Sequence, residues 1–268
     1  MQYKLLASDF DNTLVPFGEP CPRPAVVKAV KKMQAAGGKF VLSTGRGYCA
    51  INKQQLGGIR FDYAIANNGA CVVDRDGAII AEHPMTNEEM YALVDFCEDY
   101  NYPLQFNFRD GYYAYCEYES LRDFYAQLSG SGLTCKDGED QDRHLLDMPF
   151  SAFGMLAAED IAKFQAKYGY LGLQFLPYHV TGCDILRAGQ DKATGLQALL
   201  DHLGLAAADC VAVGDGPNDA GMLALAGRSY CMADGMKTAK AAAKALAPAA
   251  APDGIAQLCR SLWPEIFR

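Results

Sequence analysis

The segment Tyr3-Lys4-Leu5-Leu6-Ala7-Ser8-Asp9-Phe10-Asp11 decides the fold class of this 268-residue chain. Its short apolar run predicts a buried β-strand, and two acidic residues arrive at the point where that strand ends. If the backbone stays extended, Asp9 and Asp11 project to the same side. Taken alone, the pair fits a solvated acidic turn better than a catalytic site, so the meaning of the pair depends on the rest of the chain.

Apolar strands and helical patterns alternate on both sides of a long middle section. The pattern predicts, in order, a helix over 25–36, a strand over 39–43, a helix over 48–56 and a strand over 61–66. The same rhythm returns with a helix over 193–203, a strand over 210–213 and a helix over 219–226, and an alanine-rich surface helix is expected within 237–252. Strands separated by helices imply a parallel sheet with right-handed crossovers.

The middle section has a different pattern. Asp74-Arg75-Asp76-Gly77 predicts a hairpin turn between two short strands. Alternating strands and helices without the earlier rhythm follow, at 88–100, 104–108, 112–116, 150–156, 160–168, 173–175 and 183–186. We therefore predict the α/β class, with a Rossmann-like parallel sheet core and an inserted α+β cap domain. The expected boundaries are 1–81 and 187–268 for the core and 82–186 for the cap.

Composition and charge exclude several classes of protein. The net charge of −8 argues against a general affinity for nucleic acid or for an anionic membrane surface. No signal peptide is expected at the amino terminus, and no segment approaches the roughly 20 apolar residues of a membrane span. The ten cysteines are scattered and form no Cys-x-x-Cys pair, so we interpret them as buried apolar residues in a reducing cytoplasm.

Three further segments place polar groups at predicted strand ends or helix starts. Thr44-Gly45-Arg46 follows the second strand and offers a hydroxyl and backbone amides to a phosphate oxygen. Lys192 opens a helix with a compact positive charge. The loop 214–219 adds Asp215, Asn218 and Asp219 after a later strand. A helix cap, a solvated charge and a tight turn are the alternative explanations. Carboxylates without histidine or cysteine point to Mg²⁺ rather than zinc.

Together these segments resemble the four motifs of the haloacid dehalogenase-like superfamily, and most closely its Cof-type branch. The motifs are Asp9-Phe10-Asp11-Asn12-Thr13-Leu14, Thr44-Gly45-Arg46, Lys192 and Gly214-Asp215-Gly216-Pro217-Asn218-Asp219. Asn68-Gly69-Ala70 and Asp253-Gly254-Ile255-Ala256 also resemble that branch.

The resemblance implies a Mg²⁺-dependent phosphatase. Asp9 is then the nucleophile that forms an aspartyl phosphate, and Asp11 is the general acid and base. The metal set is Asp9, Asp11 through its backbone carbonyl, Asp215 and Asp219. Thr44, Gly45, Arg46, Lys192 and Asn218 bind the substrate and its phosphate. The expected substrate is a small phosphorylated metabolite such as a sugar phosphate, and the expected state is a monomer or weak homo-oligomer.

Three other functions are alternatives to phosphate hydrolysis: dinucleotide binding, a phosphomutase and a phospho-ligand sensor. Gly45-Arg46-Gly47-Tyr48-Cys49-Ala50 matches a dinucleotide fingerprint, but Asp62 precedes the third strand, whereas a ribose-binding acid should end the next strand. A phosphomutase on the same fold stays open, because the sequence does not separate it from a phosphatase. A non-catalytic phospho-ligand sensor is disfavoured because the acidic and basic motif residues are all present. Substrate choice is expected from cap residues, with Asn107, Arg109, Tyr112, Tyr113 and His179 as candidates.

Overall fold

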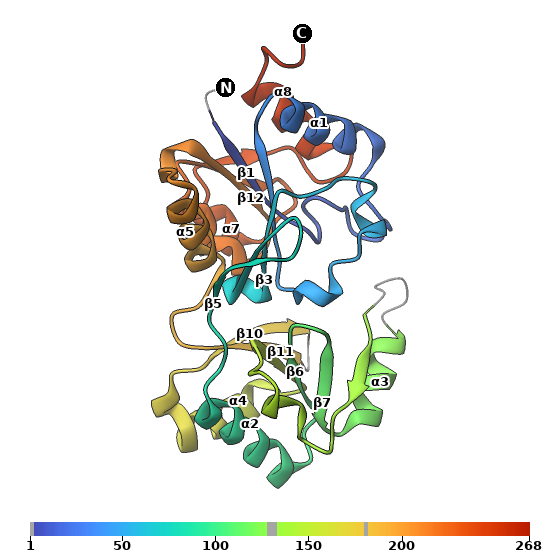
Figure 1. Cartoon of the computed structure of the whole chain (residues 1–268), viewed down its shortest axis with the longest axis vertical. Helices are drawn as coiled ribbons and strands as arrows, with labels where there is room; N and C mark the ends of the chain where they lie inside the picture. Colours follow the sequence, from blue (N-terminus) through green and yellow to red (C-terminus); the bar gives the residue numbers. More distant parts are fainter. Residues whose placement is uncertain (1–2, 128–132, 180–181) are drawn as a thin grey trace. The chain divides into compact units, whose positions relative to one another are not determined.

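The computed structural model describes residues 3–127, 133–179 and 182–268, and these form two compact units. The first unit comprises Met1–Gly45, Ile51–Ala81 and Asp191–Arg268, and the second comprises Arg46–Ala50 and Glu82–Gln190. Each unit is built on one β-sheet (Figure 1). The domain boundaries that we expected from the sequence stay a prediction of domain organisation.

The sheet of the first unit has the strand order β14-β13-β12-β1-β2-β3-β4-β5. Its strands from β14 to β3 are parallel, and β4 runs antiparallel to β3. This confirms the predicted Rossmann-like core. The strands are β1 (Leu5–Asp9), β2 (Lys39–Ser43), β3 (Tyr63–Ala66), β4 (Cys71–Asp74), β5 (Ile79–Glu82), β12 (Cys210–Gly214), β13 (Arg228–Met232) and β14 (Ala245–Ala247).

Two groups of helices pack on this sheet. Helix α1 (Pro24–Ala35) contacts α8 (Gly254–Leu262), and the two lie together in Figure 1. Helices α5 (Lys192–Leu203), α6 (Ala220–Leu225) and α7 (Lys237–Ala242) share a core with residues of β1, β2 and β12. Asp191 caps α5 by accepting a hydrogen bond from the Thr194 amide, and Gly204 ends the helix in the left-handed region with φ of 63°.

One helix predicted from the sequence is absent, and another is shorter than expected. The segment 48–56 forms two single 3₁₀ turns, Tyr48–Ala50 and Gln54–Leu56, because a polar run precedes Gly57 and only Leu56 is buried in those turns. The alanine-rich segment is helical only over Lys237–Ala242 and then forms the edge strand β14. Alanine packs in either state, so composition alone did not locate this strand.

The sheet of the second unit has the order β10-β11-β9-β6-β7-β8, and all its neighbours are antiparallel except β7 and β8. Helices α2 and α4 supply one face of its core through side chains such as Phe96 and Phe164. The elements are α2 (Asn87–Tyr100), β6 (Leu104–Asn107), β7 (Tyr112–Cys116), α3 (Tyr118–Gln127), β8 (Cys135–Asp137), β9 (Ser151–Gly154), α4 (Ala158–Tyr168), β10 (Gln174–His179) and β11 (Gly182–Leu186). Helix α3 and strand β8 were not predicted from the sequence.

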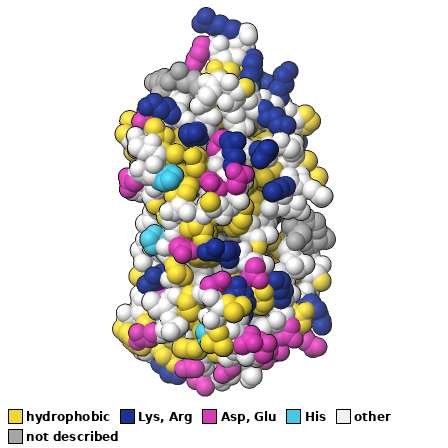
Figure 2. Space-filling view, in the orientation of Figure 1, with side chains coloured by type: hydrophobic (Ala, Val, Ile, Leu, Met, Phe, Trp, Pro, Cys, Tyr) yellow, Lys and Arg dark blue, Asp and Glu magenta, His cyan; other side chains and the backbone are white. Residues whose placement is uncertain are grey.

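Surface charge, the cysteines and the helix lengths complete the description of the fold. Lysine and arginine side chains are scattered among acidic ones on the face in view (Figure 2). All ten cysteines carry free thiols. Among the described residues, no helix has both the length and the apolar character that a membrane span requires.

Candidate active site

Three neighbouring parallel strands of the first unit, β12, β1 and β2, end at the same edge of its sheet. Strand β1 ends at Asp9, which lies level with Ser43 of β2, and Ser8 lies level with Val213 of β12. Because these strands are parallel, the residues that follow them meet at the carboxyl edge. The local folding of the chain therefore brings Asp9, Thr44 and Asp215 to one place.

Lys192 lies fully buried at the first turn of α5 and joins two carboxylates. Its Nζ donates to Asp9 Oδ1 at 2.6 Å and to Asp219 Oδ1 at 2.7 Å. Burial alone would lower the pKa of this ammonium group, but Asp219 and Asp9 raise the pKa above its usual range. Lys192 is therefore a fixed positive charge beside Asp9.

Asp219 holds the loop that carries Asp215. Its second oxygen, Oδ2, accepts from the backbone amides of Asp215 and Gly216, both at 2.9 Å. Gly214 permits this approach, since a Cβ there would lie 2.4 Å from the Asp219 Cγ. Both oxygens of Asp219 are thus engaged by the protein, which makes it an organiser of Lys192 and of the Asp215 loop.

Asp215 is fixed from two further sides. Thr13 donates its hydroxyl to Asp215 Oδ1 at 3.0 Å, and the Met236 amide donates to the Asp215 carbonyl oxygen at 2.7 Å. Burial raises the pKa of the Asp215 carboxyl to about 6, and repulsion by Asp219 adds to the shift. Burial likewise raises the pKa of Asp9, against the opposing effect of Lys192.

The three carboxylates of Asp9, Asp215 and Asp219 lie close enough to share a metal ion. Each offers one oxygen, and these oxygens lie within 4.8 Å of one another. The three negative charges exceed the single charge of Lys192 by two, and burial disfavours that excess. A divalent cation with a preference for oxygen ligands, such as Mg²⁺, fits both the donor set and the charge.

Asp11 lies outside this group of carboxylates. It is exposed and forms an isolated bridge with Val15, in a tight turn where Asn12 takes a φ of 59°. The Phe10 carbonyl oxygen accepts from the Val15 amide at 2.9 Å. Asp9 therefore clusters with Asp215 and Asp219, while the roles expected for Asp9 and Asp11 stay a prediction.

The turn after β2 is held by the end of β3. Thr44 is 1% exposed, and its backbone donates to the Ile65 carbonyl and accepts from the Asn68 amide. Gly45 and Arg46 are half-exposed, and Arg46 belongs by its contacts to the second unit. The segment after Arg46 is a 3₁₀ turn and not an α-helix. A phosphate at this turn would therefore meet individual backbone N–H groups and not the N-terminus of an α-helix.

Asn68 and Thr13 are polar residues beside the carboxylate cluster, and neither was predicted from the sequence as a site residue. The side-chain Nδ2 of Asn218 donates to Asn68 Oδ1 at 2.9 Å, so Asn218 lies against the turn after β3. Asn67 and Asn68 take positive φ angles of 51° and 50°. Gly69 continues the turn at 102°, where a Cβ would lie 1.9 Å from the Asp191 carbonyl oxygen. The dipeptide Asn-Asn before glycine was the available signal for this left-handed turn.

The cap candidates lie in a sheet with a buried polar row. Gln105 Nε2 donates to Asn107 Oδ1 at 3.0 Å, and Asn107 Nδ2 donates to Ser151 Oγ at 2.9 Å. Arg109 pairs with Glu82, and the Tyr113 hydroxyl donates to Asp110, both at the surface. The side chain of His179 lies outside the described residues.

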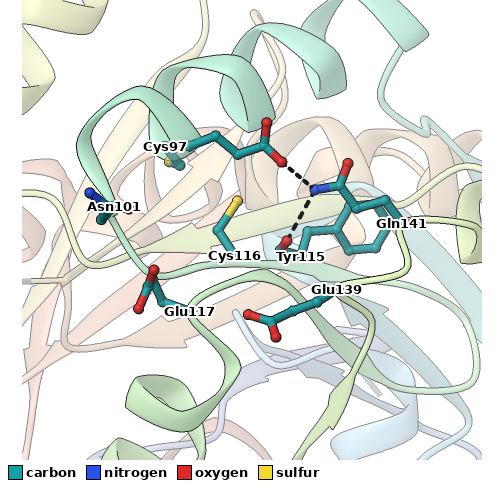
Figure 3. Close-up of a pocket in the computed structure, with 8 residues that line it drawn as sticks. Cys97, Asn101, Tyr115, Cys116, Glu117, Glu139 and Gln141 are labelled. Carbon is teal, nitrogen blue, oxygen red and sulfur yellow. Dashed lines mark hydrogen bonds between the residues drawn. The ribbon is translucent and has the colours of Figure 1, made fainter.

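A separate hollow of about 320 Å³ lies elsewhere in the second unit (Figure 3). Gln141 spans it by donating to Glu98 at 2.7 Å and to the Tyr115 carbonyl oxygen at 3.2 Å. It contains none of the residues that the sequence marked for catalysis. The remaining lining residues are Cys97, Asn101, Cys116, Glu117 and Glu139.

Comparisons with known proteins identify the family. A sequence model of the haloacid dehalogenase-like hydrolases matches residues 6–258. The Escherichia coli 5-amino-6-(5-phospho-D-ribitylamino)uracil phosphatase YbjI is 26% identical over 267 residues, covering 91% of this chain and 90% of YbjI.

Two solved structures share the fold. A HAD/COF-like hydrolase from Plasmodium vivax has a TM-score of 0.85 at 21% identity, covering 98% of this chain and 96% of that chain. The phosphatase BT1666 from Bacteroides thetaiotaomicron has a TM-score of 0.83 at 22% identity, covering 99% and 95%. The chain therefore belongs to the haloacid dehalogenase-like hydrolases.

Proposed function

We propose that the chain is a Mg²⁺-dependent phosphatase that hydrolyses a small phosphorylated metabolite through an aspartyl phosphate on Asp9. One observation carries the proposal. The buried Asp9 carboxylate lies 2.6 Å from the Lys192 ammonium group and within metal-sharing distance of Asp215 and Asp219. This arrangement combines an oriented nucleophile with positive charge for the transferring phosphoryl oxygens.

Each residue has a role that its position supports. Asp9 attacks phosphorus in line with the leaving oxygen, which departs with a proton from Asp11. Asp11 then accepts a proton from the water that hydrolyses the aspartyl phosphate. The exposure of Asp11 suits a group that exchanges protons with substrate and water. Lys192 neutralises phosphoryl charge, and Thr44, Gly45, Arg46 and Asn218 complete the phosphate-binding set.

Asp9 and Asp215 are the side chains that would hold Mg²⁺, together with the Asp11 carbonyl. The ion would supply charge neutralisation between the nucleophile and the phosphate. Asp219 stays in the proposed metal set, but its two engaged oxygens favour an orienting role. The structure therefore supports ranking Asp215 above Asp219 as a direct ligand.

We propose a phosphorylated sugar or sugar alcohol as the substrate class. The relative YbjI acts on a ribityl phosphate, as its name states. The neutral amide and hydroxyl row of Gln105, Asn107 and Ser151 is suited to hydroxyl-rich ligands. On this proposal the segment 82–186 is a cap that selects the leaving group, and the protein acts in the cytoplasm.

A substrate panel tests the proposal. Purified protein with Mg²⁺ is incubated with sugar phosphates, sugar-alcohol phosphates, nucleotides and non-sugar phosphates, and released orthophosphate is measured. We expect release from at least one hydroxyl-rich substrate, and none from the Asp9→Asn variant. Phosphorus NMR of the products separates the alternatives, since isomerised substrate without orthophosphate would identify a phosphomutase. Tight binding without turnover would identify a sensor.

A further inference from the structure

The second unit contains a short segment, Arg46–Ala50, that is remote in sequence from the rest of that unit. Tyr112, the first residue of β7, anchors it. The Gly47 amide donates to the Tyr112 hydroxyl oxygen at 2.8 Å, and both residues are buried. A buried amide that lacks a backbone partner needs such an acceptor, so this hydrogen bond is costly to remove.

The packing around this hydrogen bond is close. A Cβ at Gly47 would lie 2.8 Å from Tyr112 Cε1 and 3.4 Å from its hydroxyl oxygen. Only glycine therefore allows the backbone to approach the ring at this distance. Cys49 adds a second, weaker contact, with its Sγ 3.9 Å from the Phe108 carbonyl oxygen.

The Tyr112 hydroxyl keeps its proton. Burial raises the pKa of this phenol, whereas the Gly47 amide and the positive charge of Arg46 act in the opposite direction. The neutral phenol accepts from Gly47 and retains one O–H to donate.

The Gly47 amide belongs to the peptide group that links Arg46 to Gly47. Because a peptide group is planar, a partner on its N–H also fixes the carbonyl of Arg46 and limits the ψ angle of that residue. Thr44 and Gly45 belong to the first unit, and Arg46 is the residue at which the chain passes to the second. Arg46 is therefore oriented by the second unit, while Thr44 is held by β3.

We propose that Tyr112 is a positioning residue of the phosphate-binding turn, acting through the Gly47 amide to hold Arg46 in its phosphate-binding orientation. This inference rests on the proposed role of Arg46 in binding the phosphoryl group. It assigns to a cap tyrosine a task in phosphate binding in addition to any contact with the leaving group.

The first test compares Tyr112→Phe with Tyr170→Phe, an exposed tyrosine of the same unit whose hydroxyl donates to Glu88 at 3.1 Å. We expect Tyr112→Phe to raise KM, and the Kd of orthophosphate measured by calorimetry, by about fivefold. We expect kcat to change less than KM, because Asp9 and Lys192 are untouched. Equal constants for the wild type and Tyr112→Phe would overturn the inference.

A double-mutant cycle separates positioning from general damage. In an Arg46→Ala background, Tyr112→Phe should have no further effect on the Kd of orthophosphate, because the residue that Tyr112 positions is gone. Gly47→Ala should reproduce the phenotype of Tyr112→Phe, since its Cβ displaces the ring. Additive effects of Arg46→Ala and Tyr112→Phe would show that Tyr112 acts elsewhere and would contradict the inference.

Amide hydrogen exchange tests the anchor without any substrate. Peptides that cover 46–50 should exchange faster in Tyr112→Phe than in the wild type or in Tyr170→Phe. Unchanged exchange would overturn the anchor. Failure of the wild type to hydrolyse any phosphate would instead overturn the proposed function, and the calorimetric cycle would still decide whether Tyr112 positions Arg46.

Discussion

The two units bury polar groups in different ways. The cluster of Asp9, Lys192 and Asp219 is charged, and its hydrogen bonds of 2.6 and 2.7 Å join full charges. The row of Gln105, Asn107 and Ser151 is neutral, with bonds of 3.0 and 2.9 Å. Removing one member of a buried charged cluster leaves another charge without its partner, whereas removing a neutral group loses about 1 kcal/mol for each hydrogen bond. The charged cluster therefore tolerates far less change.

The largest expected effect comes from Asp9→Asn, in the charged cluster of the first unit. The amide keeps the shape of the side chain but is a poor nucleophile, so we expect kcat to fall at least about 10⁴-fold. Circular dichroism should show an intact fold. The exposed Asp76→Asn is the matched control and should keep full activity. Substantial turnover by Asp9→Asn would rule out the aspartyl-phosphate mechanism.

Removal of divalent cations is expected to have the next largest effect. Chelation should reduce activity about 10³-fold, and added Mg²⁺ should restore it. Mg²⁺ at 100 times its Kd should also stabilise the folded wild type by about 2.7 kcal/mol, seen as a higher Tm. We expect Asp215→Asn to lose this shift in Tm. If the Tm of the wild type did not change on addition of Mg²⁺, the metal assignment would be contradicted.

Lys192→Met removes the positive charge of the buried cluster and keeps a side chain of similar length. It leaves the Asp9 and Asp219 carboxylates buried without their cation, which should cost about 3–5 kcal/mol of stability and lower kcat about 10²–10³-fold. Chemical denaturation and steady-state kinetics measure the two effects. The exposed Lys28→Met on α1 serves as control. If both variants were equally stable, the cluster would not be the charged centre that we describe.

The smallest effect is expected in the neutral row. Asn107→Leu keeps the volume but removes the bonds to Gln105 and Ser151, so stability should fall by about 2 kcal/mol. We expect kcat/KM to change by up to about tenfold, and by more for hydroxyl-rich substrates than for a simple aryl phosphate. Gln165→Leu, on the exposed side of α4, is the control. If kcat/KM changed by the same factor for every substrate, the row of Gln105, Asn107 and Ser151 would have no role in substrate selection.

The same contrast explains what the sequence could predict. Asp9, Thr44 and Asp215 follow strands whose apolar runs are plain, so their meeting at one sheet edge was foreseeable. The double role of Asp219, which binds Lys192 and holds the Asp215 loop, was not foreseeable. It depends on which backbone amides donate to the second carboxylate oxygen. The turn at Asn67, Asn68 and Gly69 needed backbone angles that no periodicity shows.

In the second unit the sequence predicted most strands and helices but few contacts. The row of Gln105, Asn107 and Ser151 depends on the register between β6 and β9, which is a tertiary property. The wrong helix over 48–56 has a related origin. Gly47, just before it, and Cys49 within it contact Tyr112 and Phe108, residues about 60 positions away that no local pattern reveals.

The strand order of the first sheet has a consequence for biosynthesis. Leu5 of β1 pairs with Cys210 of β12, about 205 residues later in the chain. At roughly 5–20 residues per second, a ribosome takes about 10–40 seconds to supply that partner. The antiparallel pairing of β6 with β7 is local and can form meanwhile. Asp9 can meet Lys192, Asp215 and Asp219 only after roughly 180–210 further residues have been made, so this cluster of charged side chains assembles late relative to β1.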